Sequence, residues 1–140
     1  MLRVFFRHDN RLHGEISRLI YALVRDFTTE AAGKPTRLAA VVVFQSSGSF
    51  CRFHPHWHSL FLEGGFDRED RFIHVPTVDL ARMSRCFRQR VIAFFLERKL
   101  LNERLAKNML DWTHSGFCER IDPPPGRLLE DSRSARTLHP

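Results

Sequence analysis

The sequence predicts an α+β fold in which helices pack on an antiparallel sheet. Towards both ends of the chain the apolar residues recur in steps of three and four, which is the period of an amphipathic helix. Between these segments lie two apolar runs joined by the turn sequence "SSGS" at 46–49, and this arrangement is typical of an antiparallel hairpin. The length of 140 residues suits one domain with a modest core.

The first predicted element is an amphipathic helix over residues 10–32. Its apolar positions begin at Leu12 and continue in steps of three and four. Asp9 can cap its start, as can the residue that follows it, and Gly33 favours its end. We therefore expect one long helix with a single apolar stripe facing the core.

Two strands and a candidate third strand follow this helix. Residues 37–45 ("RLAAVVVFQ") are continuously apolar and rich in β-branched residues, which predicts a central strand buried on both faces. Residues 50–62 form the second strand, and the glycine pair at 64–65 is expected to end it. The sequence "RFIHV" at 71–75 is the candidate third strand.

Beyond the strands the apolar period becomes helical again. The stripe over residues 80–95 predicts a helix with Asp79 near its start. We expect a break around residues 100–102, after which the helical pattern continues to Trp112.

The composition changes near the end of the chain. Three consecutive prolines and scattered charges without a period predict a disordered tail over residues 118–140, after a domain over residues 1–117. No apolar run approaches the roughly 18 residues of a membrane span, and the first residues do not read as a signal peptide. The 3 cysteines are too widely spaced to indicate a zinc ribbon or a disulfide framework. We therefore expect a cytoplasmic protein that does not enter a membrane.

The positive charge is concentrated in the second helical region. The formal net charge is +6, and residues 82–107 hold eight Lys or Arg against two Glu, so the whole excess lies there. A localised basic stretch is expected of a nucleic-acid binder, and a solvated helix face is the alternative interpretation. The candidate DNA-contacting residues lie mostly off the apolar stripe, and they are Arg82, Arg85, Arg88 and Arg90.

Three histidines occupy alternate positions of the second strand. His54, His56 and His58 would therefore point to the same face, and Trp57 would point to the other. Imidazole is a common ligand of divalent metals, so His56 and His58 could share one ion. His54 is collinear and lies further along the strand, while Gln45 at the end of the neighbouring strand is a candidate third ligand. A polar sheet face or a chance cluster is the alternative.

The sequence "AVVVFQSSGSFCRFHPHWHSLFLEGGF" at 40–66 resembles the HUH rolling-circle nucleases, in the form found in two-tyrosine transposases of bacterial insertion sequences. In that family a histidine, a bulky apolar residue and a second histidine stand on a central strand. An apolar strand ending in Gln precedes this strand, and a Gly-containing turn follows it. The resemblance covers residues 1–117, which would make the chain an amino-terminal fragment with a partial HUH domain.

The resemblance implies a chemistry for these residues. His56 and His58 would hold Mg²⁺ or Mn²⁺ with one further ligand, and the ion would polarise a phosphodiester of single-stranded DNA at an insertion-sequence end. Imidazole suits softer ions than magnesium, so manganese or zinc could occupy the site in vitro. The family also implies a tyrosine nucleophile on a helix after the histidine strand, which forms a 5′-phosphotyrosine link.

The chain departs from the family at the nucleophile. No tyrosine follows His58, and the single tyrosine, Tyr21, lies among the apolar residues of the first helix, where we expect it to belong to the core. The sequence therefore predicts a truncated, catalytically incomplete transposase that binds metal and DNA. Two alternatives remain, a non-catalytic nucleic-acid-binding protein and a small histidine-rich metalloprotein.

Overall fold

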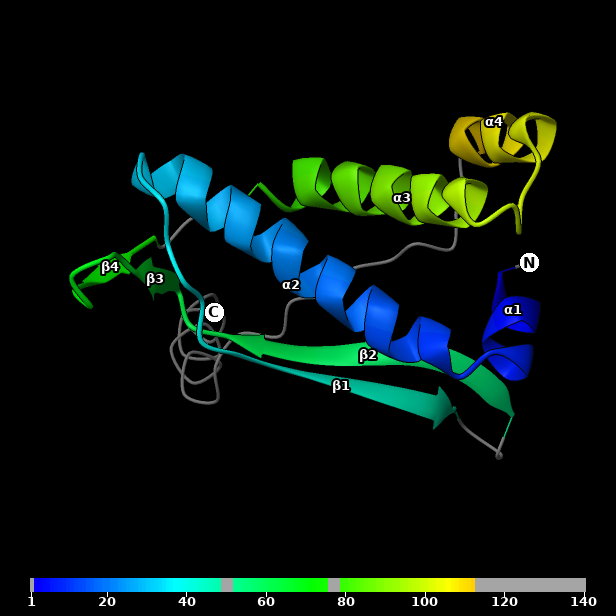
Figure 1. The fold of residues 1–140 in the computed structure, drawn as a ribbon, viewed down its shortest axis with the longest axis horizontal. Coiled ribbons are helices and arrows are strands. Elements are labelled where there is room, and N and C mark those ends of the chain that lie inside the picture. Colours follow the sequence, from blue (N-terminus) through cyan, green and yellow to red (C-terminus); the bar gives the residue numbers. More distant parts are fainter. Residues whose placement is uncertain (1, 49–51, 76–78, 113–140) are drawn as a thin grey trace, which may run out of the picture.

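The computed structural model describes residues 2–48, 52–75 and 79–112, and these form an α+β protein, as the sequence predicts (Figure 1). The described residues contain four helices and two small antiparallel sheets of two strands each. In chain order the elements are α1 (Arg3–His8), α2 (Arg11–Ala32), β1 (Ala40–Ser47), β2 (Phe53–Phe61), β3 (Gly64–Phe66), β4 (Phe72–His74), α3 (Leu80–Glu97) and α4 (Glu103–Asp111). The expected tail over residues 118–140 lies outside the described residues.

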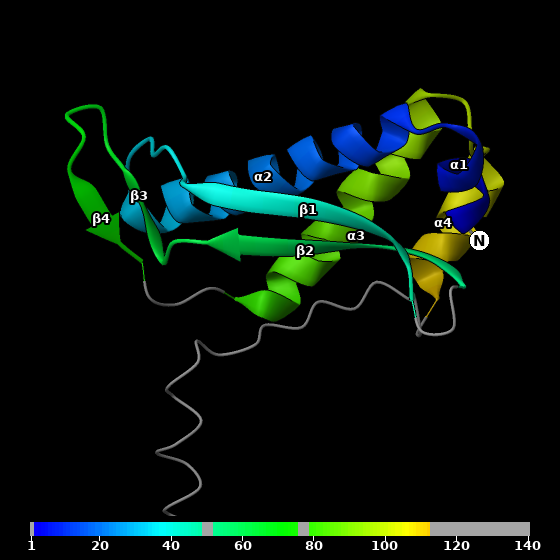
Figure 2. The ribbon, with the colours of Figure 1, turned by 90° about the horizontal axis from the view of Figure 1, so that it is seen from below.

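The helices lie on one side of the hairpin that β1 and β2 form. Figure 2 looks onto this hairpin with the helices behind it, and Figure 1 shows α2 between the hairpin and α3. The contacts between elements agree with these views, because α2 packs on β1, α3 packs on α2, and α4 packs on α3. No described element covers the other face of the hairpin, which we call the open face.

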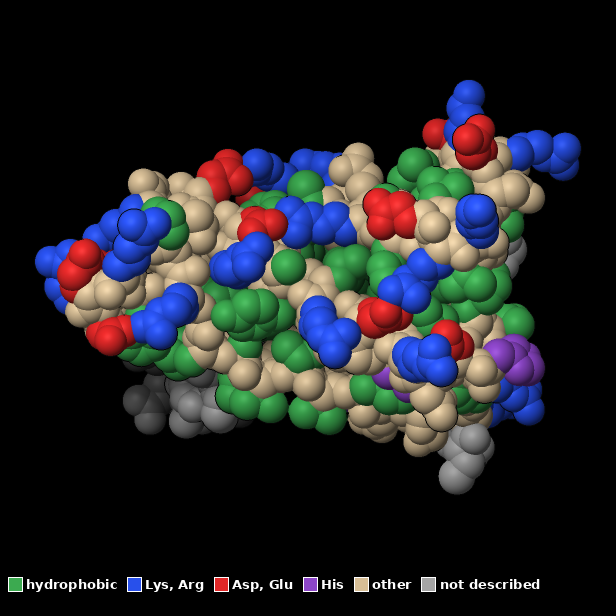
Figure 3. Space-filling view, in the orientation of Figure 1, with side chains coloured by type: hydrophobic (Ala, Val, Ile, Leu, Met, Phe, Trp, Pro, Cys, Tyr) green, Lys and Arg blue, Asp and Glu red, His purple; other side chains and the backbone are tan. Residues whose placement is uncertain are grey.

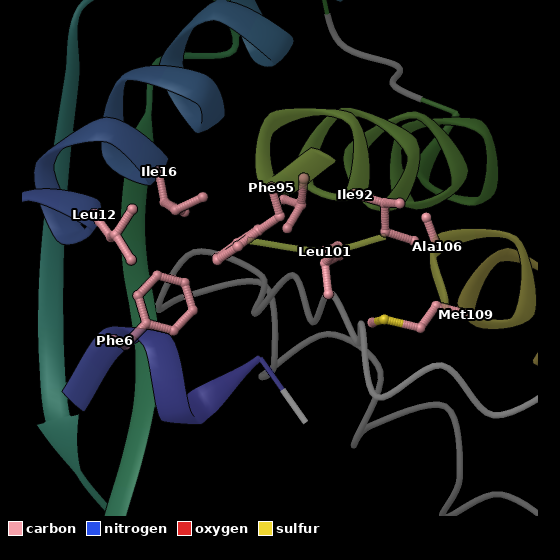
Figure 4. Packing of buried hydrophobic residues seen from close by; sticks show 9 residues of the cluster. Phe6, Leu12, Ile16, Ile92, Phe95, Leu101, Ala106 and Met109 are labelled. Atoms are coloured by element: carbon pink, nitrogen blue, oxygen red, sulfur yellow. The ribbon is translucent and has the colours of Figure 1, made fainter. Parts of the chain in front are cut away.

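The core lies where α1, the start of α2 and the end of α3 meet (Figure 4). The side chains of Phe6, Leu12 and Ile16 gather around Phe95, which is completely buried. Phe6 and Phe95 make an edge-to-face contact with ring centroids 5.7 Å apart, a geometry that aromatic pairs favour. The cluster continues towards α4 through Ile92, Leu101, Ala106 and Met109.

Helix α2 runs over Arg11–Ala32 and agrees with the predicted helix. The carboxylate of Asp9 accepts a hydrogen bond from the backbone nitrogen of Arg11 at 2.9 Å, and Gly33 ends the helix with a φ of 68°. The short α1 was not predicted, because its six residues are less than two turns and show no clear period.

The predicted helix after Asp79 and its break are also confirmed. Asp79 caps α3 by accepting a hydrogen bond from the backbone nitrogen of Arg82 at 2.9 Å. The chain leaves the helix after Glu97, and Asn102 caps α4 through the backbone nitrogen of Leu105. Helix α3 and helix α4 therefore begin with the same kind of side-chain cap.

The expectation that residues 37–45 form a strand buried on both faces is wrong. The strand starts at Ala40, and its residues alternate between a covered and an exposed face. Val41 and Val43 are 58% and 52% exposed, because helices cover only the inner face of this two-stranded sheet. The apolar composition therefore reflects one packed face and one open face.

We expected the glycine pair at 64–65 to end the second strand, but it forms part of a further strand. β2 stops at Phe61, and Gly64 and Gly65 belong to β3, which pairs with β4 in a separate sheet. Gly64 has a φ of 149°, and a Cβ there would overlap the carbonyl oxygen of Ile73 in β4. This close approach of two backbones requires glycine.

We expect Gly64→Ala to lower the free energy of unfolding by more than about 1 kcal/mol, because alanine resists this φ and would force the strands apart. Gly14→Ala is the matched control. Gly14 lies in α2 with open space around its Cβ position, so alanine there should raise the free energy of unfolding by about 0.5–1 kcal/mol. Urea denaturation of both variants measures the difference. Equal stabilities would contradict the proposed overlap at β4.

Candidate metal site and basic helix

Trp57 sets the direction of the side chains along β2. Its indole nitrogen donates a hydrogen bond to Ser17 Oγ of α2 at 3.1 Å, and its ring makes an edge-to-face contact with Phe6. Because alternate residues of a strand face opposite ways, an inward Trp57 places His56 and His58 on the open face. The predicted separation of the histidines from Trp57 is therefore confirmed.

The three imidazoles stand in a row on this face. Ring centroids are 5.4 Å apart for His54 and His56, and 4.9 Å apart for His56 and His58. The hairpin register places Gln45 of β1 directly opposite His56. The sequence-predicted residues of the metal site thus lie on two paired strands with one shared surface.

The side chain of Gln45 is oriented towards the histidines. Its amide nitrogen donates to the carbonyl oxygen of Ser47 at 2.9 Å, which leaves Oε1 3.1 Å from Nε2 of His58. Neighbouring ligand atoms of an octahedral Mg²⁺ site, with bonds of about 2.1 Å, are about 3 Å apart. In this contact His58 Nε2–H donates a hydrogen bond to Gln45 Oε1, because an amide oxygen only accepts. The two atoms could therefore take adjacent ligand positions of such an ion only after Nε2 gives up that hydrogen.

His56 is held by the backbone of its own strand. Its Nδ1 lies 2.6 Å from the carbonyl oxygen of His54, and because a carbonyl oxygen only accepts, Nδ1 carries the hydrogen. In the neutral ring Nε2 is then left with its lone pair. A hydrogen bond from the other ring nitrogen to a carbonyl oxygen fixes the tautomer of many metal-binding histidines. His56, His58 and Gln45 are therefore the candidate donor set on the open face.

His54 is not part of a three-imidazole group. Among the described residues, no three His, Cys, Asp or Glu side chains come close enough together to hold one ion. The hairpin strands also contain no Asp or Glu, so the donor set lacks a carboxylate. A metal-binding role for His54 remains a prediction.

The four candidate DNA-contacting arginines of α3 have different surroundings. Arg82 forms a bidentate ion pair with Glu30 of α2 at 2.8 and 2.9 Å, and its hydrogen bonds lower the pKa of the Glu30 carboxyl. Arg90 pairs with Asp26 of α2 at 2.8 Å. Acidic and basic side chains therefore alternate over this side of the molecule (Figure 3).

Arg88 is occupied inside the protein as well. Its guanidinium donates to the backbone carbonyl oxygens of Met109 and, at 2.9 Å, of Trp112. Met109 lies in the last turn of α4 and Trp112 is its C-cap residue, and at this end backbone oxygens lack helical partners and a cation is favourable. Arg88 therefore caps α4 at its C-terminal end.

Arg85 is exposed and has neither an ion pair nor a hydrogen bond within the part of the chain that the structure describes. It is the one arginine of the four without a hydrogen-bonding partner there. Helix α3 lies behind α2, on the side of the hairpin opposite to the open face (Figure 2). The histidines and Arg85 therefore do not form one compact site.

Sequence reasoning missed the acidic partners of these arginines. Glu15, Asp26 and Glu30 are spaced by 11 and 4 residues, which are close to whole numbers of helical turns. They share one face of α2, and Glu15 pairs with Arg98 near the end of α3. This spacing was the available signal that α2 would neutralise much of the basic helix.

Tyr21 lies on the covered side of the hairpin, as expected for a packing residue. Its hydroxyl donates to the carbonyl oxygen of Leu38 at 3.3 Å, just before β1 begins. The two-stranded sheet stands between this hydroxyl and the histidine row on the open face. The tyrosine therefore anchors α2 to the start of the hairpin.

A comparison of the chain with protein-family models, with curated proteins and with solved structures finds no match. In the described portion of the chain, no helix is long and apolar enough to cross a membrane.

Proposed function

We propose that this chain has an HUH-transposase-like domain that binds a divalent metal and single-stranded DNA at an insertion-sequence end. The observation that supports this proposal best is the joint position of His56, His58 and Gln45 on the open face. The resemblance of residues 40–66 to two-tyrosine transposases suggested these residues as a pair of imidazoles with a third ligand. The amide oxygen of Gln45 lies 3.1 Å from the His58 ring, and in our proposal it would take that third position when an ion replaces their hydrogen bond.

The chemistry of the donor set favours Mn²⁺ over Mg²⁺. His56 and His58 would each contribute an imidazole nitrogen, and Gln45 would contribute a neutral oxygen. A bound ion would polarise the phosphodiester and offset the charge that develops during cleavage. The open face is uncovered in the described structure, so a flexible single strand could reach these residues from solvent.

Among the described residues, no tyrosine lies beside this donor set. The hydroxyl of Tyr21 is bonded to Leu38 on the covered side of the sheet, so it cannot approach a phosphorus on the open face without refolding. A covalent intermediate requires an attacking group in line with the scissile bond. We therefore propose binding of metal and DNA by this chain without covalent capture of the DNA.

The two alternative functions give different results in one experiment. If the open face binds a metal that contacts phosphate, Mn²⁺ should raise the affinity for a fluorescent single-stranded oligonucleotide. A non-catalytic nucleic-acid-binding protein that uses α3 alone should show the same affinity with Mn²⁺ and with EDTA. A histidine-rich metalloprotein should bind Mn²⁺ without binding the oligonucleotide. Fluorescence anisotropy at constant ionic strength separates these outcomes.

Calorimetry with Mn²⁺ tests the metal site. We expect His58→Ala and His56→Ala each to weaken binding at least about 10-fold, the scale seen when metal surroundings are disturbed. Gln45→Ala should weaken Mn²⁺ binding in the same direction. His74→Ala is the matched control, because His74 is exposed but lies on β4, away from the row. Equal affinity in His58→Ala and His74→Ala would exclude the proposed site.

Arg85 and Arg88 should separate DNA contact from stability. Arg85→Ala should reduce the log–log dependence of single-stranded DNA affinity on salt by about 0.7, the contribution of one phosphate contact. It should leave stability within about 0.5 kcal/mol. Arg88→Ala should instead lower the free energy of unfolding by about 1–2 kcal/mol, because two carbonyls of α4 lose a charged donor. If Arg85→Ala leaves the salt dependence unchanged, α3 is only a solvated surface.

Incubation with labelled single-stranded DNA and Mn²⁺, followed by a denaturing gel, tests the missing nucleophile. We expect no protein–DNA adduct, because the one tyrosine faces away from the histidines. Tyr21→Phe should show the same result as the unmodified chain. An adduct that appears in the unmodified chain and disappears in Tyr21→Phe would show that the chain is catalytically complete.

A further inference from the structure

The open face has an apolar half beside the histidines. Val41 and Leu60 are direct cross-strand partners, and Val43 is the partner of His58. Val41, Val43 and Leu60 are 58%, 52% and 72% exposed. A group of apolar side chains on a sheet face is typical of a surface that another chain covers. The apolar half and the imidazole pair adjoin each other along β2.

The open face is also free of formal charge. Neither β1 nor β2 contains an Asp, Glu, Lys or Arg. Two copies of this face could therefore approach each other without repulsion between acidic or basic side chains. Such self-complementarity is what a two-fold interface requires, since the same surface is used on both chains.

The donor set is incomplete for a zinc ion. Zn²⁺ in structural sites is almost always bound by four nitrogen or sulfur ligands in a tetrahedron. The pair His56 and His58 supplies two nitrogens, and the described residues bring no third His, Cys, Asp or Glu to them. A second copy of the same pair would supply exactly the two imidazoles that are lacking, without any new residue type.

The geometry of paired sheets allows both contacts at once. Packed sheets lie about 10 Å apart, so an imidazole that stands on one sheet reaches about halfway to the other. A two-fold axis parallel to β2 would place His56 and His58 against the same residues of the second copy. The same axis would bring Leu60 against its counterpart, with Val43 at the side of the interface.

We propose that Zn²⁺ joins two copies of this chain face to face through His56 and His58, with Val41, Val43 and Leu60 buried beside the ion. This inference rests on the metal-binding part of the proposed function and not on its DNA-binding part. Gln45 is not needed in the zinc site, because a second pair of imidazoles takes the remaining positions. The dimer covers the open face and therefore excludes single-stranded DNA from it.

Sedimentation velocity of the full chain with ZnCl₂ tests this inference. We expect a monomer in EDTA and a dimer in Zn²⁺, with one ion for two chains. His58→Ala should weaken the zinc-dependent association at least about 10-fold. Leu60→Asp should also weaken it, because a carboxylate would face its own copy across the axis. Val4→Asp and His74→Ala are the matched controls, since both residues are exposed on other elements.

Gln45→Ala separates this inference from the proposed function. This variant should lose Mn²⁺ affinity and keep the zinc-dependent dimer. A chain that binds Mn²⁺ through His58 but stays monomeric in Zn²⁺ would overturn the dimer alone. Association that persists in His58→Ala, or that exceeds two chains for each ion, would also overturn it. Far-ultraviolet circular dichroism of each variant establishes that a loss of association does not come from unfolding.

Discussion

The inward position of Trp57 is the constraint on which the arrangement of the open face depends. Its indole is held by Ser17 of α2 and by the ring of Phe6. These contacts fix which alternate residues of β2 face the helices and which face solvent. A slip of the register by one residue would turn Trp57 to solvent and His56 and His58 into the core. The packing of one aromatic side chain therefore keeps the imidazoles accessible, together with the apolar residues Val41 and Val43.

The contact between α2 and α3 has a comparable effect on the charge. The helices are joined by ion pairs at Glu15–Arg98, Asp26–Arg90 and Glu30–Arg82. Exposed pairs of this kind contribute little to stability individually. Their larger effect is on the surface potential, because the acidic side chains of α2 neutralise part of the positive charge along α3. A count of charges along the chain therefore overstates the positive field that a DNA strand would meet.

The order of helices and strands could be predicted because its signals are local. Period, caps and turn residues indicated α2, the hairpin and the break before α4. The exposure of Val41 and Val43 could not be predicted, because an apolar strand has the same composition whether one face or both are covered. The alternate histidines could be placed on one face from the strand period alone. The role of Arg88 at the end of α4 depends on a contact between residues that are 21 and 24 positions apart.

The open face combines two properties that conflict in an isolated chain. Exposed apolar side chains such as Leu60 favour a cover, whereas the proposed metal site would have to stay accessible to a DNA strand. A permanent helix over this face would bury the apolar half and would also close the approach to His58. A cover that depends on an ion resolves the conflict, because its stability follows the concentration of that ion. In the proposed dimer, the imidazole pair would decide whether the face is open for nucleic acid or closed against a second copy.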